Sequence, residues 1–277
     1  MIFNFLEHPV CLEFPRRLEA TSWAGHIPLA MFLISALRPR TLVELGTHRG
    51  ESYCAFCQAV ETVQSETRCY AVDTWQGDAH AGEIEAEVLT DLKAHHDALY
   101  SDFSQLIQST FDDALPHFAD GSIDLLHIDG FHTYEAVRRD FETWQPKMSK
   151  QGIVLFHDTT VRERNFGVWK FWAEIKANRP HFEFTHTHGL GVLAVGIEVP
   201  ENLRFLFSAD EHQAAVIRNF FNALGERVEL AMNYRKQCAR VADLERYEEI
   251  VENSRVIRKY HQLKTSGTGR LLIKLVK

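Results

Sequence analysis

The feature that most constrains this chain is an alternation of short strand-like runs with longer segments of helical periodicity. Five runs read as strands: Thr41–Gly46, Cys69–Trp75, Ser104–Thr110, Ile123–Gly130 and Gly152–Asp158. Helical segments separate them, the clearest being Ser52–Thr62 and Tyr134–Trp144. Strands that alternate with helices form βαβ units, and buried parallel strands are nearly continuous apolar runs. The sequence therefore predicts an α/β fold built on a Rossmann-like, mostly parallel sheet.

The ends of the chain differ from this central part. The first forty residues are expected to be helical, with Ile27–Leu37 as the most apolar piece, and His181–His188 with Gly191–Ile197 predicts a late antiparallel hairpin. Beyond residue 205 an apolar face recurs at helical spacing: Ile217, Phe220, Leu224, Val228 and Ala231. We expect residues 1–204 to form the main domain and 205–277 a helical appendage. Its apolar face must be buried on the body, on a second subunit or on a fused partner.

Composition excludes several classes of protein. The formal net charge is −8, but residues 235–277 hold 11 Lys/Arg against 5 Asp/Glu, so the remainder carries 19 against 33. An acidic body argues against nucleic acid as the main partner. No run approaches the ~18–20 apolar residues of a membrane span. The N-terminus lacks a signal-peptide pattern, and the five cysteines are odd in number and scattered. We expect reduced thiols in a cytoplasmic protein.

A glycine-bearing turn, Val43–Ser52, closes the first predicted strand and opens a helix. Such a turn lets the backbone approach a ligand closely. A dinucleotide fingerprint would have a second glycine where His48 stands, so binding of a pyrophosphate is poorly supported. Asp73 ends the next strand, about 27 residues past Gly46. An acid in this position can accept hydrogen bonds from a ribose diol.

Two further acids end neighbouring strands. Asp129 follows the fourth strand and Asp158 the fifth, so both carboxylates are expected at one rim of the sheet. Oxygen ligands of this kind suit a hard divalent cation such as Mg²⁺. His132 lies three residues beyond Asp129 and is placed to act as general base on a hydroxyl. The third metal ligand is left open between His157, Thr159 and water.

The E-x-G-x-x-x-G turn from Glu44 to Gly50 resembles motif I of class I S-adenosylmethionine-dependent methyltransferases, in the form found in metal-dependent O-methyltransferases of the catechol and caffeoyl-coenzyme A type. The joint pattern between Trp23 and Gly196 is similar to methyltransferases associated with glycosyltransferases of surface polysaccharides, and to macrolide-sugar O-methyltransferases. The chain departs from its relatives at three positions. Catechol-type enzymes have lysine at His132 and Asp-Asn at Asp158-Thr159, and the macrolide-sugar type has Glu-Asp at His157-Asp158.

The resemblance implies roles for particular residues. Contacts with S-adenosylmethionine would come from Glu44, Gly46, Thr47, Gly50, Ser52, Asp73, Phe111 and Asp112. Catalysis would depend on His132 and Asp129, and a cation would be held by Asp129, Asp158 and His157.

These observations lead to an expected function and two alternatives. We expect an O-methyltransferase acting on a hydroxyl of a sugar or glycan, with a homo-oligomer or a glycosyltransferase partner formed through the C-terminal helices. One alternative is a nicotinamide-dependent oxidoreductase on the same sheet. The absence of G-x-G-x-x-G and of a Tyr-x-x-x-Lys pair weighs against it. The other is a non-catalytic binding or scaffold module that retains the fold.

Overall fold

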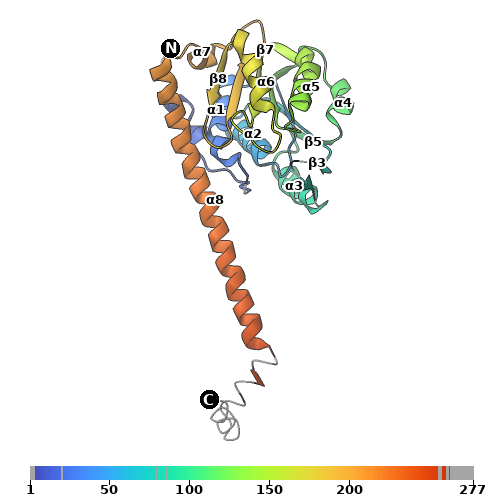
Figure 1. Cartoon of the computed structure of the whole chain (residues 1–277), viewed down its shortest axis with the longest axis vertical. Helices are drawn as coiled ribbons and strands as arrows, with labels where there is room; N and C mark the ends of the chain where they lie inside the picture. The colour runs from blue at the N-terminus through green and yellow to red at the C-terminus, as the bar shows by residue number, and fades with distance from the viewer. Residues whose placement is uncertain are drawn as a thin grey trace. The chain divides into compact units, whose positions relative to one another are not determined.

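A computed structural model of the chain describes residues 4–19, 21–78, 80, 82–84, 86–254, 258–259 and 262. Its centre is a seven-stranded sheet with the order β5-β2-β1-β6-β7-β9-β8 (Figure 1). The strands are β1 (Thr41–Leu45), β2 (Arg68–Asp73), β5 (Ser104–Gln108), β6 (Ile123–Ile128), β7 (Met148–His157), β8 (His181–Phe184) and β9 (Leu190–Ala194). The first five are parallel, whereas β9 runs antiparallel to β7 and to β8. The predicted Rossmann-like sheet with a late hairpin is confirmed.

Helices lie on both faces of this sheet (Figure 1). The α-helices that the structure describes are α1 (Ile27–Leu37), α2 (Glu51–Thr62), α3 (Ala86–Leu99), α4 (Phe111–Ala114), α5 (Tyr134–Trp144), α6 (Val168–Ile175), α7 (Arg204–Phe207) and α8 (Glu211–Asn253). Threonines cap two of them: Thr110 Oγ1 accepts the N–H of Asp113, and Thr133 Oγ1 accepts the N–H of Ala136. A small hairpin of β3 (Gly77–Asp78) and β4 (Gly82–Glu83) follows β2.

The N-terminal part differs from expectation. Residues before α1 form three short 3-10 turns instead of a continuous helical segment: η1 (Phe5–Glu7), η2 (Pro9–Leu12) and η3 (Ala24–His26). Pro9 and Pro15 each lack an N–H donor, and proline inside a helix also clashes with the preceding turn. The segment is held instead by contacts with α2, where the Gln58 side chain bonds the backbone of Phe14 and Arg16.

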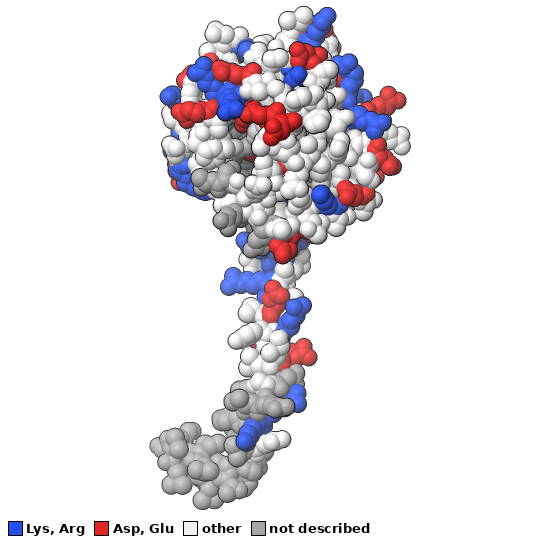
Figure 2. Space-filling view, turned by 90° about the vertical axis from the view of Figure 1, so that its right-hand side faces the viewer, with Lys and Arg blue, Asp and Glu red and all other residues white. Residues whose placement is uncertain are grey.

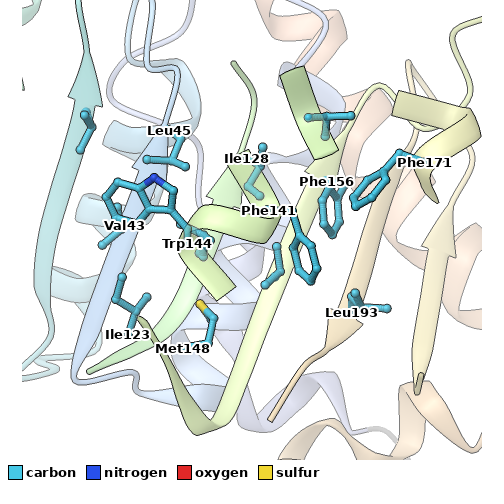
Figure 3. Packing of buried hydrophobic residues seen from close by; sticks show 14 of the residues in the cluster. Val43, Leu45, Ile123, Ile128, Phe141, Trp144, Met148, Phe156, Phe171 and Leu193 are labelled. Carbon is cyan, nitrogen blue, oxygen red and sulfur yellow. The ribbon is translucent and has the colours of Figure 1, made fainter. Parts of the chain in front are cut away.

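A cluster of buried apolar side chains lies between the sheet and helices α5 and α6 (Figure 3). Trp144 and Phe141 of α5 pack over Val43 of β1, Ile128 of β6 and Phe156 of β7, all of them buried. Burial of one such side chain contributes roughly 1.5–3 kcal/mol. This cluster ties β1, β6 and β7 together just below the edge where their carboxyl ends meet.

The chain divides into two compact units, Met1–Glu229 and Leu230–Lys277. The first part of α8 belongs to the first unit, and Ala214, Ile217, Phe221 and Val228 are buried there. Phe221 contacts Phe32 of α1, with ring centroids 5.4 Å apart. The apolar face that the sequence indicates is thus covered by the body itself up to residue 229.

Three further features bear on the chain's chemistry. None of the helices that the structure describes is long and apolar enough to cross a membrane. The five cysteines are free, four of them buried and Cys238 exposed. Basic and acidic side chains are interspersed over the face shown in Figure 2.

Candidate active site

The carboxyl ends of four adjacent parallel strands form one rim. In the order β2-β1-β6-β7, the chain leaves these strands at Asp73, Gly46, Asp129 and Asp158. A pocket of about 560 Å³ is lined by all four residues, within the range usual for small-molecule sites. It lies where the strand order reverses around β1, which is the binding position in open α/β sheets.

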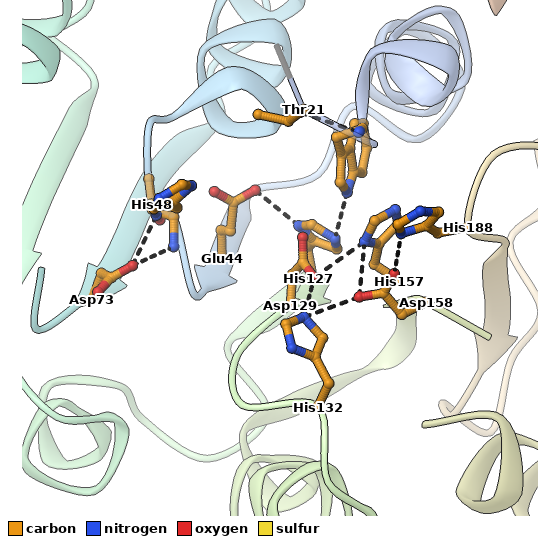
Figure 4. Close-up of polar contacts among 12 residues, drawn as sticks. Thr21, Glu44, His48, Asp73, His127, Asp129, His132, His157, Asp158 and His188 are labelled. Atoms are coloured by element: carbon orange, nitrogen blue, oxygen red, sulfur yellow. Dashed lines mark hydrogen bonds and ion pairs between the residues drawn. The ribbon is translucent and has the colours of Figure 1, made fainter. Parts of the chain in front are cut away.

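The Asp73 carboxylate organises the glycine turn (Figure 4). Its Oδ2 accepts the backbone N–H groups of Thr47 and His48, each at 2.8 Å, and its Oδ1 accepts the N–H of Trp75 at 2.7 Å. Four lone-pair sites are available on a carboxylate. Asp73 is therefore placed at the pocket as expected, but three backbone donors already use most of its capacity.

Gly46 is required by a close approach of two backbones. It has a φ of +88°, and a Cβ there would lie 2.2 Å from the carbonyl oxygen of Asp129. His48, where a dinucleotide fingerprint would place glycine, also adopts a left-handed φ of 48°. A non-glycine residue in this region stores strain that the surrounding structure must support. The three hydrogen bonds of Asp73 supply support at that point.

Asp129, His132 and Asp158 converge at one wall of the pocket (Figure 4). Nε2 of His132 lies 2.9 Å from Oδ2 of Asp158 and 3.4 Å from Oδ1 of Asp129. One ligand atom from each of the three residues can be chosen so that all lie within 4.8 Å of one another. Two carboxylates and an imidazole in such a group fit a divalent cation.

The cluster balances its own charge. Burial would lower the pKa of His132, but hydrogen bonds to Asp129 and Asp158 raise it to about 9. Burial would raise the pKa of both carboxyls, but the charge of His157 and hydrogen bonds from His132 hold them well below their usual range. Asp158 has a φ of 62°, a strained conformation for a non-glycine residue and one that clusters at functional sites.

His157 is buried beside the same two carboxylates, and its role as a metal ligand stays a prediction. Its Nδ1 lies 3.2 Å from Oδ1 of Asp129 and 3.5 Å from Oδ2 of Asp158, and the side chain is 3% exposed. Burial would lower the pKa of His157, but the charges of both aspartates raise it to about 10. The compact group of possible ligands also contains His132, which projects from the loop after β6 toward both carboxylates.

Glu44 lies beneath the rim and does not line the pocket. It is fully buried, and its Oε2 lies 2.8 Å from Nδ1 of His127, which is also fully buried. The indole N–H of Trp23 donates to Nε2 of the same histidine at 3.2 Å. Glu44 thus joins β1 to β6 and to the N-terminal segment, a role that the glycine-turn motif alone did not indicate.

The remaining expected cofactor residues divide into two groups. Those that line the pocket are Gly46, Thr47, Gly50, Ser52, Asp73 and Phe111. Within the described chain the buried Oγ1 of Thr47 has no hydrogen-bond partner, so it can bond a ligand. Asp112 faces away, where it is exposed and pairs with Arg139. His188 lines the mouth of the pocket, and its Nδ1 lies 2.9 Å from Oδ1 of Asp158.

An aromatic wall next to His132 was not anticipated from sequence. Phe166 stacks on His132 with ring centroids 4.5 Å apart, and on His80 with centroids 4.6 Å apart. Phe131 lies 4.6 Å from His80, and Arg164 donates to the His80 carbonyl at 2.6 Å. These residues come from three separate loops. Because loop sequences carry no periodic pattern, no feature of the sequence could have indicated that these side chains lie together.

Comparison with known families gives a match for the central part of the chain. Residues 43–159 match the family model described as "Methyltransferase domain". This segment of the chain is similar to methyltransferase domains. The matched segment begins in β1 and ends just after Asp158, so it includes the glycine turn, Asp73 and the Asp129–His132–Asp158 cluster. The sheet and its late hairpin have the Rossmann-like methyltransferase fold.

Relatives of known sequence or structure add the following. Uncharacterized protein y4gI of Sinorhizobium fredii is 52% identical over 183 residues, which are 66% of this chain and 20% of that protein. The chain thus spans about a fifth of the curated relative it matches. A putative caffeoyl-CoA O-methyltransferase from Staphylococcus aureus shows 15% identity and a TM-score of 0.49, over 69% of this chain and 90% of that one. The SAH-bound methyltransferase PaMTH1 of Podospora anserina shows 13% identity and a TM-score of 0.48, over 61% of this chain and 77% of that one.

Proposed function

We propose that this protein is an S-adenosylmethionine-dependent O-methyltransferase that acts on a hydroxyl of a sugar or glycan. The observation that carries the proposal is that Asp129, His132 and Asp158 meet on a wall of the pocket that also holds the glycine turn. A methyl donor on the turn would thus face a group that can take a proton from an acceptor. The motif pattern around Asp129 and Asp158, similar to that of sugar O-methyltransferases, supports the acceptor class.

In the reaction two bonds break, the sulfonium carbon–sulfur bond of the donor and the O–H bond of the acceptor, and two bonds form, the new carbon–oxygen bond and an N–H bond on the proton acceptor. The methyl group passes from the sulfonium of the donor to the acceptor oxygen, the hydroxyl proton leaves, and S-adenosylhomocysteine and a methyl ether remain. His132, with Asp129 and Asp158 beside it, is positioned to receive that proton. Gly46, Thr47 and Ser52 would hold the methionine end of the donor, and Asp73 the ribose.

A divalent cation such as Mg²⁺ is part of the proposal. Asp129 and Asp158 would hold it, with His157 beside them as the third ligand expected from the sequence, and His132 would remain the proton acceptor. When bound, the cation would lower the pKa of the acceptor hydroxyl and stabilise the developing negative charge. The aromatic wall of Phe131, His80 and Phe166 flanks this position and offers flat apolar surface to an acceptor ring.

The experiment tests binding of the methyl donor and transfer of the methyl group separately. S-adenosylmethionine should raise the melting temperature, whereas NAD should not. Transfer of an isotopically labelled methyl group should then be followed with glycan acceptors and with a catechol as comparison. His132→Ala should bind the donor but lose turnover, and His212→Ala, an exposed histidine on α8, is the matched control. Stabilisation by NAD alone would favour an oxidoreductase. Donor binding without transfer to any acceptor would favour a binding module.

A further inference from the structure

The second compact unit contains a helix with an unusual number of exposed apolar side chains. Most of the described part of this unit is the end of α8, and every side chain described from Asn233 to Val251 is exposed. The large apolar side chains, with their exposed fractions, are Leu230 (70%), Tyr234 (71%), Val241 (53%), Leu244 (56%), Tyr247 (66%), Ile250 (61%) and Val251 (38%). Most helical stability in proteins comes from packing an apolar face. This face therefore needs a surface to cover it.

The spacing of these residues specifies the kind of surface. Five of them follow intervals of alternating four and three residues, with two polar residues completing the series: Leu230, Tyr234, Gln237, Val241, Leu244, Glu248 and Val251. In heptad notation Tyr234, Val241 and Glu248 are a positions, and the others are d positions. An apolar repeat of 3.5 residues keeps one seam facing a partner helix and is typical of left-handed coiled coils.

Charges beside the seam indicate the partner. Arg240 occupies a g position and Glu245 the e position five residues later. In a parallel coiled coil each g residue faces the e residue five positions on in the other helix, and such pairs set partner and orientation. A second copy of this helix supplies both halves, so Arg240 of each copy meets Glu245 of the other. In an antiparallel pair g residues face g residues and e residues face e residues, so Arg240 would no longer face Glu245 of the other copy.

We propose that residues 230–251 form a parallel two-stranded coiled coil with a second copy of this chain. The dimer is two-fold symmetric, so each side chain of the seam faces its own counterpart. Gln237 and Glu248 place polar groups in the seam, which lowers stability but disfavours other registers. Basic, acidic and uncharged side chains are interspersed along the side of this helix that Figure 2 shows.

The first experiment measures the oligomeric state of the full chain by size exclusion with light scattering over a range of concentrations. The unaltered protein should be a dimer that dissociates on dilution. Leu244→Lys should give a monomer with an unchanged melting temperature of the first unit. Ile250→Lys is the matched control, because Ile250 is equally exposed but occupies a c position outside the seam. Glu248→Leu should tighten the dimer by about tenfold or more, since an apolar residue replaces a charge in the seam.

The second experiment tests orientation. Arg240→Glu should weaken the dimer about three- to tenfold, and Arg240→Glu combined with Glu245→Arg should restore it. Val251→Cys, with exposed Cys238 replaced by serine, should form an intermolecular disulfide on oxidation, because parallel d positions lie within bonding range. A protein that is still monomeric at about 100 μM, a concentration at which a weak dimer would already form, would overturn the proposal. So would a dimer that survives Leu244→Lys, and a dimer without the Val251→Cys disulfide would refute the parallel arrangement.

Discussion

The phenyl ring of Phe166 lies almost parallel to the imidazole of His132, with an interplanar angle of 12° and centroids 4.5 Å apart. The neighbouring backbone strengthens this contact, because the N–H of Gly167 donates to the carbonyl of His132 at 2.7 Å. A Cβ on Gly167 would lie 2.2 Å from the backbone nitrogen of Tyr134, so only glycine allows this approach. The loop before α6 therefore holds His132 from one face while Asp129 and Asp158 hold its Nε2.

Phe166→Leu should consequently reduce turnover by about tenfold, because the imidazole loses a flat support and its orientation loosens. Phe166→Tyr keeps the ring and should retain most of the activity. The measurement is kcat and KM for the acceptor, together with calorimetry of donor binding. Donor affinity should be the same in all three proteins. Equal losses in the Leu and Tyr variants would show that the ring stack does not position His132.

Asp73→Ala should weaken binding of S-adenosylmethionine by about 1–3 kcal/mol, the scale of lost charge-assisted hydrogen bonds. It should also lower the melting temperature without ligand, since Thr47, His48 and Trp75 each lose a backbone hydrogen-bond acceptor. Asp73→Asn retains one acceptor oxygen, so its donor affinity and melting temperature should lie between those of the unaltered protein and Asp73→Ala. Calorimetry on the folded Asp73→Ala protein decides the matter: unchanged affinity would remove the ribose assignment and leave Asp73 a purely structural role.

The rim of the site could be predicted from sequence because each of its acids ends a run that fills one strand. Asp73, Asp129 and Asp158 leave parallel neighbours, so geometry alone brings them to one edge. The stack of Phe166 on His132 and His80 could not be predicted, because it depends on how three loops pack. Periodicity beyond residue 205 likewise indicates an apolar face but not what covers it. The body covers it as far as Val228.

Glu51, at the start of α2, should make stability depend on pH. Burial raises the pKa of this carboxyl to about 7, although Thr21 and the N–H of Glu19 donate hydrogen bonds to it. A raised folded-state pKa means that the stabilising contribution is fully present below pH 4.5 and is lost as pH rises through about 7. The ionised form at pH 8 then costs on the order of 2–3 kcal/mol.

Glu51→Gln cannot ionise and should lack this pH dependence. Urea unfolding at pH 5 and pH 8 provides the measurement, and the difference between the two proteins isolates Glu51 from other titrating groups. Glu51→Gln should be the more stable protein at pH 8 by about 1–2 kcal/mol, while the two converge toward pH 5. Parallel stability curves would mean that Glu51 remains ionised, or equally solvated, in the folded state.

The chemical step should need His132, Asp129 and Asp158, and a divalent cation should assist it. His132→Ala should keep donor affinity but lose ~10²–10⁴-fold in turnover, the usual contribution of a general base. Asp129→Asn and Asp158→Asn should also lose turnover, whereas Asp120→Asn, an exposed acid paired with Lys147, should not. Removal of the cation by a chelator should reduce turnover of the unaltered protein in the same way as Asp129→Asn and Asp158→Asn. Because His132 must be neutral to accept a proton and its pKa is raised to about 9, activity in chelator should rise with pH up to that value.

Full activity in excess chelator, with no metal found by elemental analysis, would leave a base-only mechanism. Undiminished turnover in His132→Ala would require another proton acceptor.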